Sequence, residues 1–294
     1  MKNLIIVTGG AGFVGSNLIK FLLKKTKKKI ISYDNYSSGS KKNHIINPRV
    51  KYLSGNTTEI DKRLLQYKKK IHSLFHFGEF ARIFQSFLKM NECIESNSVG
   101  SNSVFNFCLK NKIKLIYSAT SASLGNKGND KNLSPYAFTK AKNLELLENL
   151  KKWFNFKYEV IYFYNVYGPH QICSGKMSTV IGIFEDHYKK RKSLPVVRPG
   201  TQTRRFTHID DTIKICYLAW KKNLCRHYSI SSKKSYSIIE VAKLFKSKIK
   251  YLPKRSGERY VSALTDKNLS NKIYKYFGKI SLKNYIQNFI KNSQ

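Results

Sequence analysis

Short apolar runs alternate with longer helical patterns through the first half of the chain. Six runs have the length and the β-branched and aromatic content of strands: "NLIIVTG", "KIISYD", "VKYLSG", "HSLFHFG", "IKLIYSA" and "YEVIYFY". Stretches with helical periodicity begin between them, near Phe13, Glu59, Asn91 and Tyr136. Strands that alternate with helices at this spacing predict βαβ units around a buried parallel sheet, which is an α/β, doubly wound architecture.

The pattern becomes looser after Tyr164, where loops with proline and glycine separate shorter helices. We expect these helices at about residues 177–190, 210–220, 238–246 and 282–292. This part is too short for a second doubly wound domain, so it predicts a smaller α/β cap over the carboxyl ends of the strands. We place the larger unit at residues 1–168, with a segment of about 205–230 returning to it. The cap then comprises residues 169–204 and 231–294.

A glycine-rich turn joins the first strand to the first helix. "LIIVTGGAGFVGS" places Gly9, Gly12 and Gly15 there, so that no side chain separates the backbone from a pyrophosphate, and the helix N-terminus offers N–H groups to it. Three glycines alone could form a closely packed turn, but the second strand ends about 20 residues later at Asp34, as the dinucleotide fingerprint requires. A carboxylate there binds both ribose hydroxyls of adenosine and repels a 2′-phosphate, which favours NAD over NADP. The larger unit is therefore predicted to be a Rossmann-type NAD-binding domain.

The stretch "SPYAFTKAKNLELLENL" predicts a helix with a tyrosine just inside its start. Ser134 suits the N-cap position, and Pro135 suits the first helical position. Tyr136 and Lys140 then share one face of the helix. Taken alone, the two residues fit an ordinary helix surface better than a phenol whose proton a nearby cation helps to release.

Together these motifs resemble the short-chain dehydrogenase/reductase superfamily, whose members carry Tyr-x-x-x-Lys after the fifth strand and a hydroxyl residue at its end. Tyr136 and Lys140 match the first feature, and "IYSATSASLG" supplies the second, with Thr120 aligned best. The resemblance implies that Tyr136 transfers a proton, that Lys140 favours its ionised form, and that Thr120 hydrogen-bonds the substrate oxygen. It also implies cofactor contacts by Phe13, Val14, Asn35, Asn56, Phe77, Gly78 and Asn97, besides the glycines, Asp34, Tyr136 and Lys140.

Three later segments resemble the extended branch of this superfamily, which acts on nucleotide sugars: "YNVYGPH", "PGTQTRRFTHIDD" and "LPKRSGERY". The resemblance covers essentially the whole chain and makes the cap a substrate-binding domain. It implies that Asn165, Arg204 and Arg255 bind the phosphates of the substrate, and arginine forks suit a diphosphate. In isolation, Asn165 could instead cap a turn, and the two arginines could be surface cations.

The residues after Thr120 bear on the reaction. They read Ser121-Ala122-Ser123, without the glutamate of the dehydratases and decarboxylases of this branch or the cysteine of its fucose-type epimerase–reductases. The chain therefore resembles the UDP-glucose 4-epimerases most. That resemblance implies C4 epimerisation of a UDP-hexose through a transient 4-keto intermediate, with no net use of NAD. It also implies a homodimer, packed through helices near residues 91–109 and 136–150.

Three positions depart from the pattern of the 4-epimerases. Asn56 stands where an aspartate is usual, and Ala81 stands where a lysine contacts the cofactor, a role that the neighbouring Arg82 could take over. Glu79, in "HFGEFARIF", has no counterpart that explains it.

The charge of the chain raises a different class of function. Lys and Arg number 55 against 17 Asp and Glu, a net charge of +38, which is compatible with nucleic acid or an anionic membrane surface as partner. The basic residues are spread along the whole chain, however, without a basic tail or an aromatic–basic platform. We therefore expect anionic small molecules as ligands, with no dedicated nucleic-acid binding and no membrane association.

The remaining composition excludes several other classes. Five cysteines without C-x-x-C spacing indicate neither a zinc site nor a disulfide framework, and no apolar run is long enough to span a membrane, so we expect a cytoplasmic protein without a metal. Two alternatives to the epimerase remain open. One is a nucleotide-sugar oxidoreductase with net turnover of NAD(H), and the other is an inactive RNA-binding scaffold of the same fold.

Overall fold

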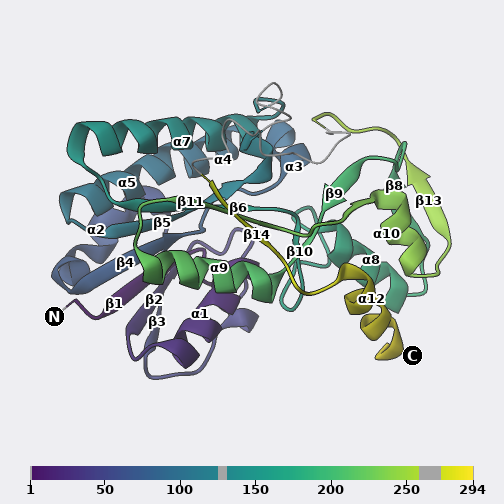
Figure 1. The fold of residues 1–294 in the computed structure, drawn as a ribbon, viewed down its shortest axis with the longest axis horizontal. Helices are drawn as coiled ribbons and strands as arrows, with labels where there is room; N and C mark the ends of the chain where they lie inside the picture. The colour runs from purple at the N-terminus through teal and green to yellow at the C-terminus, as the bar shows by residue number, and fades with distance from the viewer. Residues whose placement is uncertain (1, 125–130, 258–272, 294) are drawn as a thin grey trace.

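The computed structural model describes residues 2–124, 131–257 and 273–293. An eight-stranded sheet with the order β14-β11-β6-β5-β4-β1-β2-β3 forms its larger part, and every pairing in that sheet is parallel (Figure 1). The strand order reverses between β1 and β4, which opens a crevice at the carboxyl ends of these strands. The structure confirms the predicted Rossmann-type, doubly wound α/β fold.

All six strands predicted from the sequence are present in this sheet. They are β1 (Leu4–Thr8), β2 (Lys29–Asp34), β3 (Val50–Ser54), β4 (Ile71–His76), β5 (Lys114–Thr120) and β6 (Tyr158–Phe163). Two more strands extend the sheet beyond β6: β11 (His227–Ser231) and β14 (Ile273–Phe277). β11 lies at the end of the segment predicted to return to the larger unit. β14 also joins the large sheet, although the sequence analysis placed its residues in the cap.

Helices cover both faces of the large sheet (Figure 1). α2 (Ile60–Leu64), α5 (Ser101–Lys110) and α7 (Pro135–Phe154) lie on one face, and α1 (Phe13–Lys25) and α9 (Ile209–Lys222) lie on the other. Because successive side chains of a strand point to opposite faces, the adjacent residues Leu115 and Ile116 of β5 are both buried but belong to different core clusters. The sheet is therefore buried on both sides, as its apolar strands predict.

Shorter elements lie at the ends of the strands. The 3₁₀ helices are η1 (Lys41–Asn43), η2 (Thr57–Glu59) and η3 (Leu65–Lys70). Between β4 and α5 lie α3 (Ile83–Leu88), α4 (Met90–Ile94) and a π-helical turn, η4 (Glu95–Gly100), and α6 (Ser121–Leu124) follows β5 directly. Among the described residues, no helix is long and apolar enough to cross a lipid bilayer.

A smaller part with its own core lies beside the carboxyl ends of the strands (Figure 1). Its helices are α8 (Val180–Lys189), α10 (Ile238–Leu244) and α12 (Leu282–Lys291). Its strands form pairs: β7 (Val166–Tyr167) with β10 (Thr207–His208), β8 (Leu194–Val197) with β13 (Ile249–Leu252), and β9 (Thr203–Arg205) with β12 (Ser235–Ser237). Phe184, Phe245 and Ile286 are fully buried between its helices and strands. The four helices predicted after Tyr164 correspond to α8, α9, α10 and α12.

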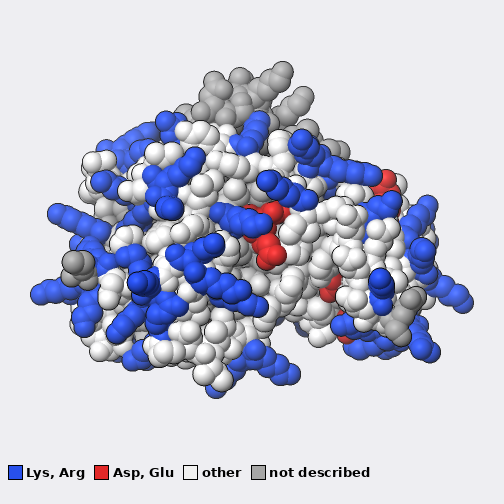
Figure 2. Space-filling model, turned by 60° about the horizontal axis from the view of Figure 1, so that its bottom comes forward, with Lys and Arg blue, Asp and Glu red and all other residues white. Residues whose placement is uncertain are grey.

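Lysine and arginine side chains cover much of the face shown in Figure 2, where few acidic side chains are visible. Part of the reason is that the fold buries several of the 17 acidic residues. Asp34, Glu159, Glu185 and Asp211 are each buried, and the side chain of Glu79 is 2% exposed. The ratio of basic to acidic side chains is therefore higher on the surface than in the chain as a whole.

This surface predicts an unusual response to salt. We expect the midpoint of thermal unfolding to rise between 20 mM and 500 mM NaCl, because screening relieves the repulsion among surface cations in the compact state. Differential scanning fluorimetry in the two buffers measures the effect. An unfolding midpoint that falls with added NaCl would show that attractive ion pairs outweigh this repulsion.

Candidate active site

The backbone of the glycine turn after β1 is packed so closely that its glycines leave no space for a side chain of their own. Gly9 has a φ of +67°, a conformation that residues with a side chain rarely adopt. A Cβ on Gly15 would lie 2.1 Å from the carbonyl oxygen of Gly9. α1 begins after Gly12 with no side-chain cap and no acidic residue in its first turn. The start of this helix is therefore suited to an anion such as a pyrophosphate.

Asp34 ends β2 with its carboxylate at the rim of the crevice. The carboxylate accepts hydrogen bonds from the backbone N–H groups of Ala11 (2.9 Å) and Tyr36 (2.8 Å). Burial raises the pKa of Asp34, and these two hydrogen bonds oppose the rise. Each carboxylate oxygen can still accept a further hydrogen bond, as binding of ribose hydroxyls requires.

A cavity of 470 Å³ extends from the glycine turn along the carboxyl ends of β1, β2, β3 and β4. Ten of the predicted cofactor residues line it: Gly9, Gly12, Phe13, Val14, Gly15, Asp34, Asn35, Asn56, Phe77 and Gly78. The Asn35 amide donates to the Asn56 side chain (2.8 Å), so the pair forms one polar wall without the usual aspartate. Gln85 also lines the cavity, and its Oε1 is buried with no hydrogen-bond partner among the described residues. This mixture of a glycine cradle, a carboxylate and an unsatisfied amide fits a dinucleotide such as NAD.

Part of this cavity is lined by residues that the sequence does not single out as cofactor contacts. They are Arg82, which the sequence marks only as a possible substitute for a lysine, and Lys176 and Met177, which no motif marks. The Arg82 guanidinium donates to the Met177 carbonyl oxygen (2.8 Å), which ties the loop after β4 to the segment before α8. The charge of Arg82 next to "HFGE" was a signal that could have identified it, but nothing in the sequence marks the 172–177 segment.

Asn97 does not line this cavity. It is fully buried in the π-helical turn, where its side chain accepts from the Phe80 N–H (2.7 Å) and donates to the Phe80 carbonyl oxygen (2.9 Å). The two hydrogen bonds with Phe80 fix the loop that borders the cavity. In this structure Asn97 therefore positions that loop, whereas the prediction made it a cofactor contact.

Tyr136 lies at the start of α7, as the sequence predicts. Ser134 caps this helix by accepting from the Ala137 N–H (3.1 Å), and the Tyr136 N–H donates to Ser86 in α3 (3.2 Å). The phenol is buried, which raises the pKa of Tyr136 to about 12, while a side-chain hydrogen bond with Thr120 at the end of β5 opposes this rise. The structure thus brings Thr120 and Tyr136 together.

Lys140 has a partner that the sequence did not predict. Its ammonium group forms an ion pair with Glu79 and also donates to the Ser118 carbonyl oxygen. Burial lowers the pKa of Lys140, and Glu79 opposes this effect. The charged groups with the largest effect on the pKa of Tyr136 are Glu79, which raises it, and Arg82, which lowers it. The expected effect of Lys140 on Tyr136 is therefore balanced by a carboxylate in this structure.

The three residues predicted to bind the substrate phosphates lie on separate segments of the cap side. Asn165, between β6 and β7, donates from its side-chain amide to the Arg205 carbonyl oxygen (3.1 Å), and Arg204 lies opposite Tyr236 in the β9–β12 pair. The Arg255 guanidinium lies 5.2 Å from the ring centroid of Phe84 in α3. The same helix carries Gln85. The rest of the "LPKRSGERY" segment, from residue 258, lies outside the described residues.

A model of one protein family matches residues 5–231, which is most of the chain, and its description is "NAD dependent epimerase/dehydratase family". The chain belongs to this family. NAD is therefore its cofactor, as the glycine turn and Asp34 predict. Within the described part of the chain, no three His, Cys, Asp or Glu side chains are grouped so that they could hold a metal ion.

Individual members of this epimerase/dehydratase family resemble the chain over nearly its whole length. A putative UDP-glucose 4-epimerase of Methanocaldococcus jannaschii is 27% identical over 286 residues, which covers 93% of this chain and 89% of that protein. The structure of the Thermotoga maritima UDP-glucose 4-epimerase with UDP-glucose aligns with a TM-score of 0.87 at 23% identity, covering 98% of this chain and 97% of that chain. A dTDP-glucose 4,6-dehydratase of Streptomyces venezuelae with NAD bound also has a TM-score of 0.87, at 18% identity, covering 98% and 96% of the two chains. The shared fold therefore does not by itself decide between epimerisation and dehydration.

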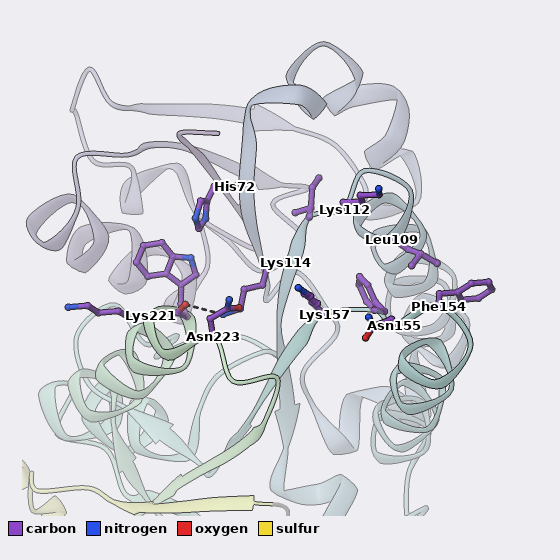
Figure 3. Close-up of a pocket in the computed structure, with 12 residues that line it drawn as sticks. His72, Leu109, Lys112, Lys114, Phe154, Asn155, Lys157, Lys221 and Asn223 are labelled. Carbon is purple, nitrogen blue, oxygen red and sulfur yellow. Dashed lines mark hydrogen bonds between the residues drawn. The ribbon is translucent and has the colours of Figure 1, made fainter. Parts of the chain in front are cut away.

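A larger cavity, of 690 Å³, lies at the opposite, amino edge of the sheet (Figure 3). Its lysines, Lys112, Lys114, Lys157 and Lys221, lie at or just after the C-terminal ends of α5, α7 and α9, where cations complement the helix dipoles. Lys114 also pairs with the buried Glu159 (3.3 Å). None of the predicted site residues, all of which lie in the described ranges, lines this cavity. We therefore propose the smaller cavity as the cofactor site of this family member.

Asp34 offers a direct test of the cofactor site. We expect Asp34→Asn to weaken NAD binding by about 10- to 100-fold, because a charge-assisted acceptor is lost, and to leave NADP binding unchanged or stronger. Titration calorimetry with both cofactors measures the two dissociation constants. Asp61→Asn, at an exposed position of α2, makes the same charge change away from the cavity and should alter neither dissociation constant. An equal loss of NAD and NADP affinity in Asp34→Asn would contradict the assignment.

Proposed function

We propose that this protein is an NAD-dependent nucleotide-sugar epimerase that inverts C4 of a UDP-hexose through a transient 4-keto intermediate. One observation carries the proposal: Thr120 and Tyr136 are joined by a hydrogen bond, and α6, which follows Thr120 directly, contains no carboxylic acid. Inversion at C4 needs one group that takes and returns a proton. Elimination of water needs a further acid or base beside it, and the epimerase therefore fits these residues better.

Tyr136, Thr120 and Arg82 have separate roles in this reaction. Bound NAD⁺ supplies the acceptor, and later the donor, of the hydride at C4. Tyr136 takes the proton of the C4 hydroxyl and gives it back to the keto oxygen, while Thr120 hydrogen-bonds that oxygen and the phenol. With its pKa raised to about 12 by burial, Tyr136 needs nearby positive charge to act as a base, and Arg82 supplies part of it.

The substrate must turn between the two hydride transfers so that the opposite face of C4 meets the cofactor. We propose that Asn165, Arg204 and Arg255 hold the diphosphate as a fixed anchor during this turn, since guanidinium forks bind phosphate oxygens in pairs. Support comes from Arg255, which lies beside α3 and therefore near the cavity that Gln85 lines. The basic surface would also attract the dianionic substrate.

The proposal also covers the division of the chain, its assembly and its location. We propose a cofactor domain of residues 1–168 with the returning segment, a substrate-binding cap, and a homodimer. The partly exposed apolar side chains of Leu88, Met90, Val99 and Phe138 support a dimer face built around α3, α4, η4 and α7. All five cysteines are unpaired, which agrees with the reducing cytoplasm.

Mass spectrometry of small molecules released from the denatured protein, followed by a screen of nucleotide sugars, tests the function. Bound NAD and interconversion of C4-epimeric UDP-hexoses without net NADH formation support the proposal. Stoichiometric NADH release would replace it with a net oxidoreductase, and a 4-keto-6-deoxy product would replace it with a dehydratase. Protein that turns over no nucleotide sugar but binds RNA with a steep salt dependence would replace it with a scaffold.

A further inference from the structure

Glu79 is a buried carboxylate at the point where β4 leads into the cavity. Its side chain is 2% exposed, and the residue is part of the cavity lining. One oxygen, Oε1, accepts hydrogen bonds from the Ser101 hydroxyl (2.8 Å), the Tyr117 hydroxyl (3.0 Å) and the Asn143 amide (3.3 Å). The other oxygen, Oε2, pairs with the Lys140 ammonium. Four donors from α5, β5 and α7 therefore fix the position of this carboxylate.

This network weakens the electrostatic effect of Lys140 on its surroundings, because its ammonium group is paired with Glu79. The Lys140 side chain is 4% exposed, and its ammonium group also donates to the Ser118 carbonyl oxygen and lies 4.7 Å from the ring centroid of Tyr117. A cation held against a carboxylate in the interior acts on a third group as a dipole, whose field decreases faster with distance than that of a free charge. Tyr136, one helical turn away, therefore gains little from Lys140.

Among the residues that the structure describes, the other titratable groups around Tyr136 add one further charge. Burial lowers the pKa of His76 to about 4, and its ring is hydrogen-bonded to Ser101, so it is neutral. Burial raises the pKa of Cys93 to about 11 and that of Tyr117 well above its usual value, so both are protonated. Arg82 remains as the cation that is not paired with Glu79.

We propose that Glu79 is a positioning residue that holds Lys140 and cancels its charge, so that ionisation of Tyr136 follows the oxidation state of the cofactor. The proposal rests on the epimerase function assigned above and deepens it. With Lys140 neutralised, the phenol loses its proton readily only while the cofactor ring is positively charged, and it keeps the proton once that charge is gone. Proton and hydride then leave and return together, which protects the 4-keto sugar from release with the enzyme in the reduced state.

Binding of the two cofactor forms tests this proposal without any sugar. The ratio of NAD⁺ to NADH affinity is measured by tryptophan and NADH fluorescence titration. Glu79→Gln leaves the Lys140 charge uncancelled and should lower the ratio by about tenfold, as expected for one added charge in a partly buried site. Lys140→Met leaves the Glu79 charge uncancelled and should raise the ratio by about tenfold. The double variant restores neutrality and should lie within about threefold of the wild type.

The pH dependence of turnover gives a second readout. The negative charge of Glu79 raises the pKa of Tyr136. Removing it in Glu79→Gln should therefore move the acid limb of the kcat/KM profile to lower pH by about one unit. Glu145→Gln neutralises an exposed acid on the same helix as Lys140 and should change neither the cofactor ratio nor the profile.

The outcomes separate this proposal from the proposed function. Opposite shifts of the cofactor ratio in Glu79→Gln and Lys140→Met support it even if the sugar substrate proves to be different. An unchanged ratio in both variants overturns it and leaves the epimerase assignment intact, since Glu79 would then only hold α7 on the sheet. If Glu79→Gln alone does not fold, Lys140→Met compared with the double variant carries the same test, and equal ratios in these two overturn the proposal.

Discussion

Tyr136→Phe is expected to reduce turnover of a UDP-hexose by about 10²- to 10⁴-fold, while NAD remains bound. The substitution removes only the phenolic oxygen, which is the group that exchanges a proton with the C4 hydroxyl. The ring remains packed at the start of α7, and the backbone bond from Tyr136 to Ser86 is unaffected. Steady-state kinetics and mass spectrometry of the released cofactor measure the two quantities.

Tyr228→Phe is a matched control for this variant. The Tyr228 hydroxyl, in β11, is also buried but has no hydrogen-bond partner among the described residues, so its removal should change neither turnover nor stability appreciably. Turnover that persists in Tyr136→Phe would remove this residue from its assigned role. Loss of turnover together with loss of NAD would instead mean that the substitution damages the cofactor site.

The large sheet could be predicted because its strands are local patterns of apolar residues. β1 to β6 are each five to seven residues long, and in β1 every position is buried, whereas the edge strand β3 has no buried position. β14 could not be predicted in the same way. Its sequence, "IYKYF", lies in the part of the chain that was predicted to form the cap, and only one of its five positions is buried. Only its pairing with β11 places it in the sheet.

Some residues of the candidate site could likewise be predicted from the sequence, and others could not. The glycine turn and Asp34 could be predicted because their spacing along the chain follows from one βαβ unit. The Glu79–Lys140 pair could not, because the two residues are 61 positions apart and meet only when β4, β5 and α7 pack together. Asn97 illustrates the opposite case. Its place near the cavity was predictable from the family resemblance, but the hydrogen bonds that occupy its side chain depend on the Phe80 loop.

The second large effect is expected on stability, from the ion pair of Lys114 and Glu159 at the amino edge of the sheet. Glu159 in β6 is fully buried, and it accepts hydrogen bonds from the N–H groups of Cys225 (3.0 Å) and Arg226 (2.8 Å) as well as pairing with Lys114. Lys114 also donates to the Trp220 carbonyl oxygen (3.0 Å) at the end of α9. The pair thus joins β5, β6, α9 and the start of β11.

We expect Lys114→Met to lower the free energy of unfolding by about 3–5 kcal/mol, because it leaves the Glu159 carboxylate buried without a countercharge. Urea unfolding followed by circular dichroism measures this free energy. Its slope against urea concentration (the m-value) should stay the same as in the wild type. Lys157→Met is the control. Lys157 lines the same cavity but is exposed, so its loss should change stability by less than about 0.5 kcal/mol. If the two variants are equally stable, Lys114 only complements the helix ends, as its neighbours in this cavity do. The backbone N–H groups of Cys225 and Arg226 would then suffice to keep the Glu159 carboxylate buried.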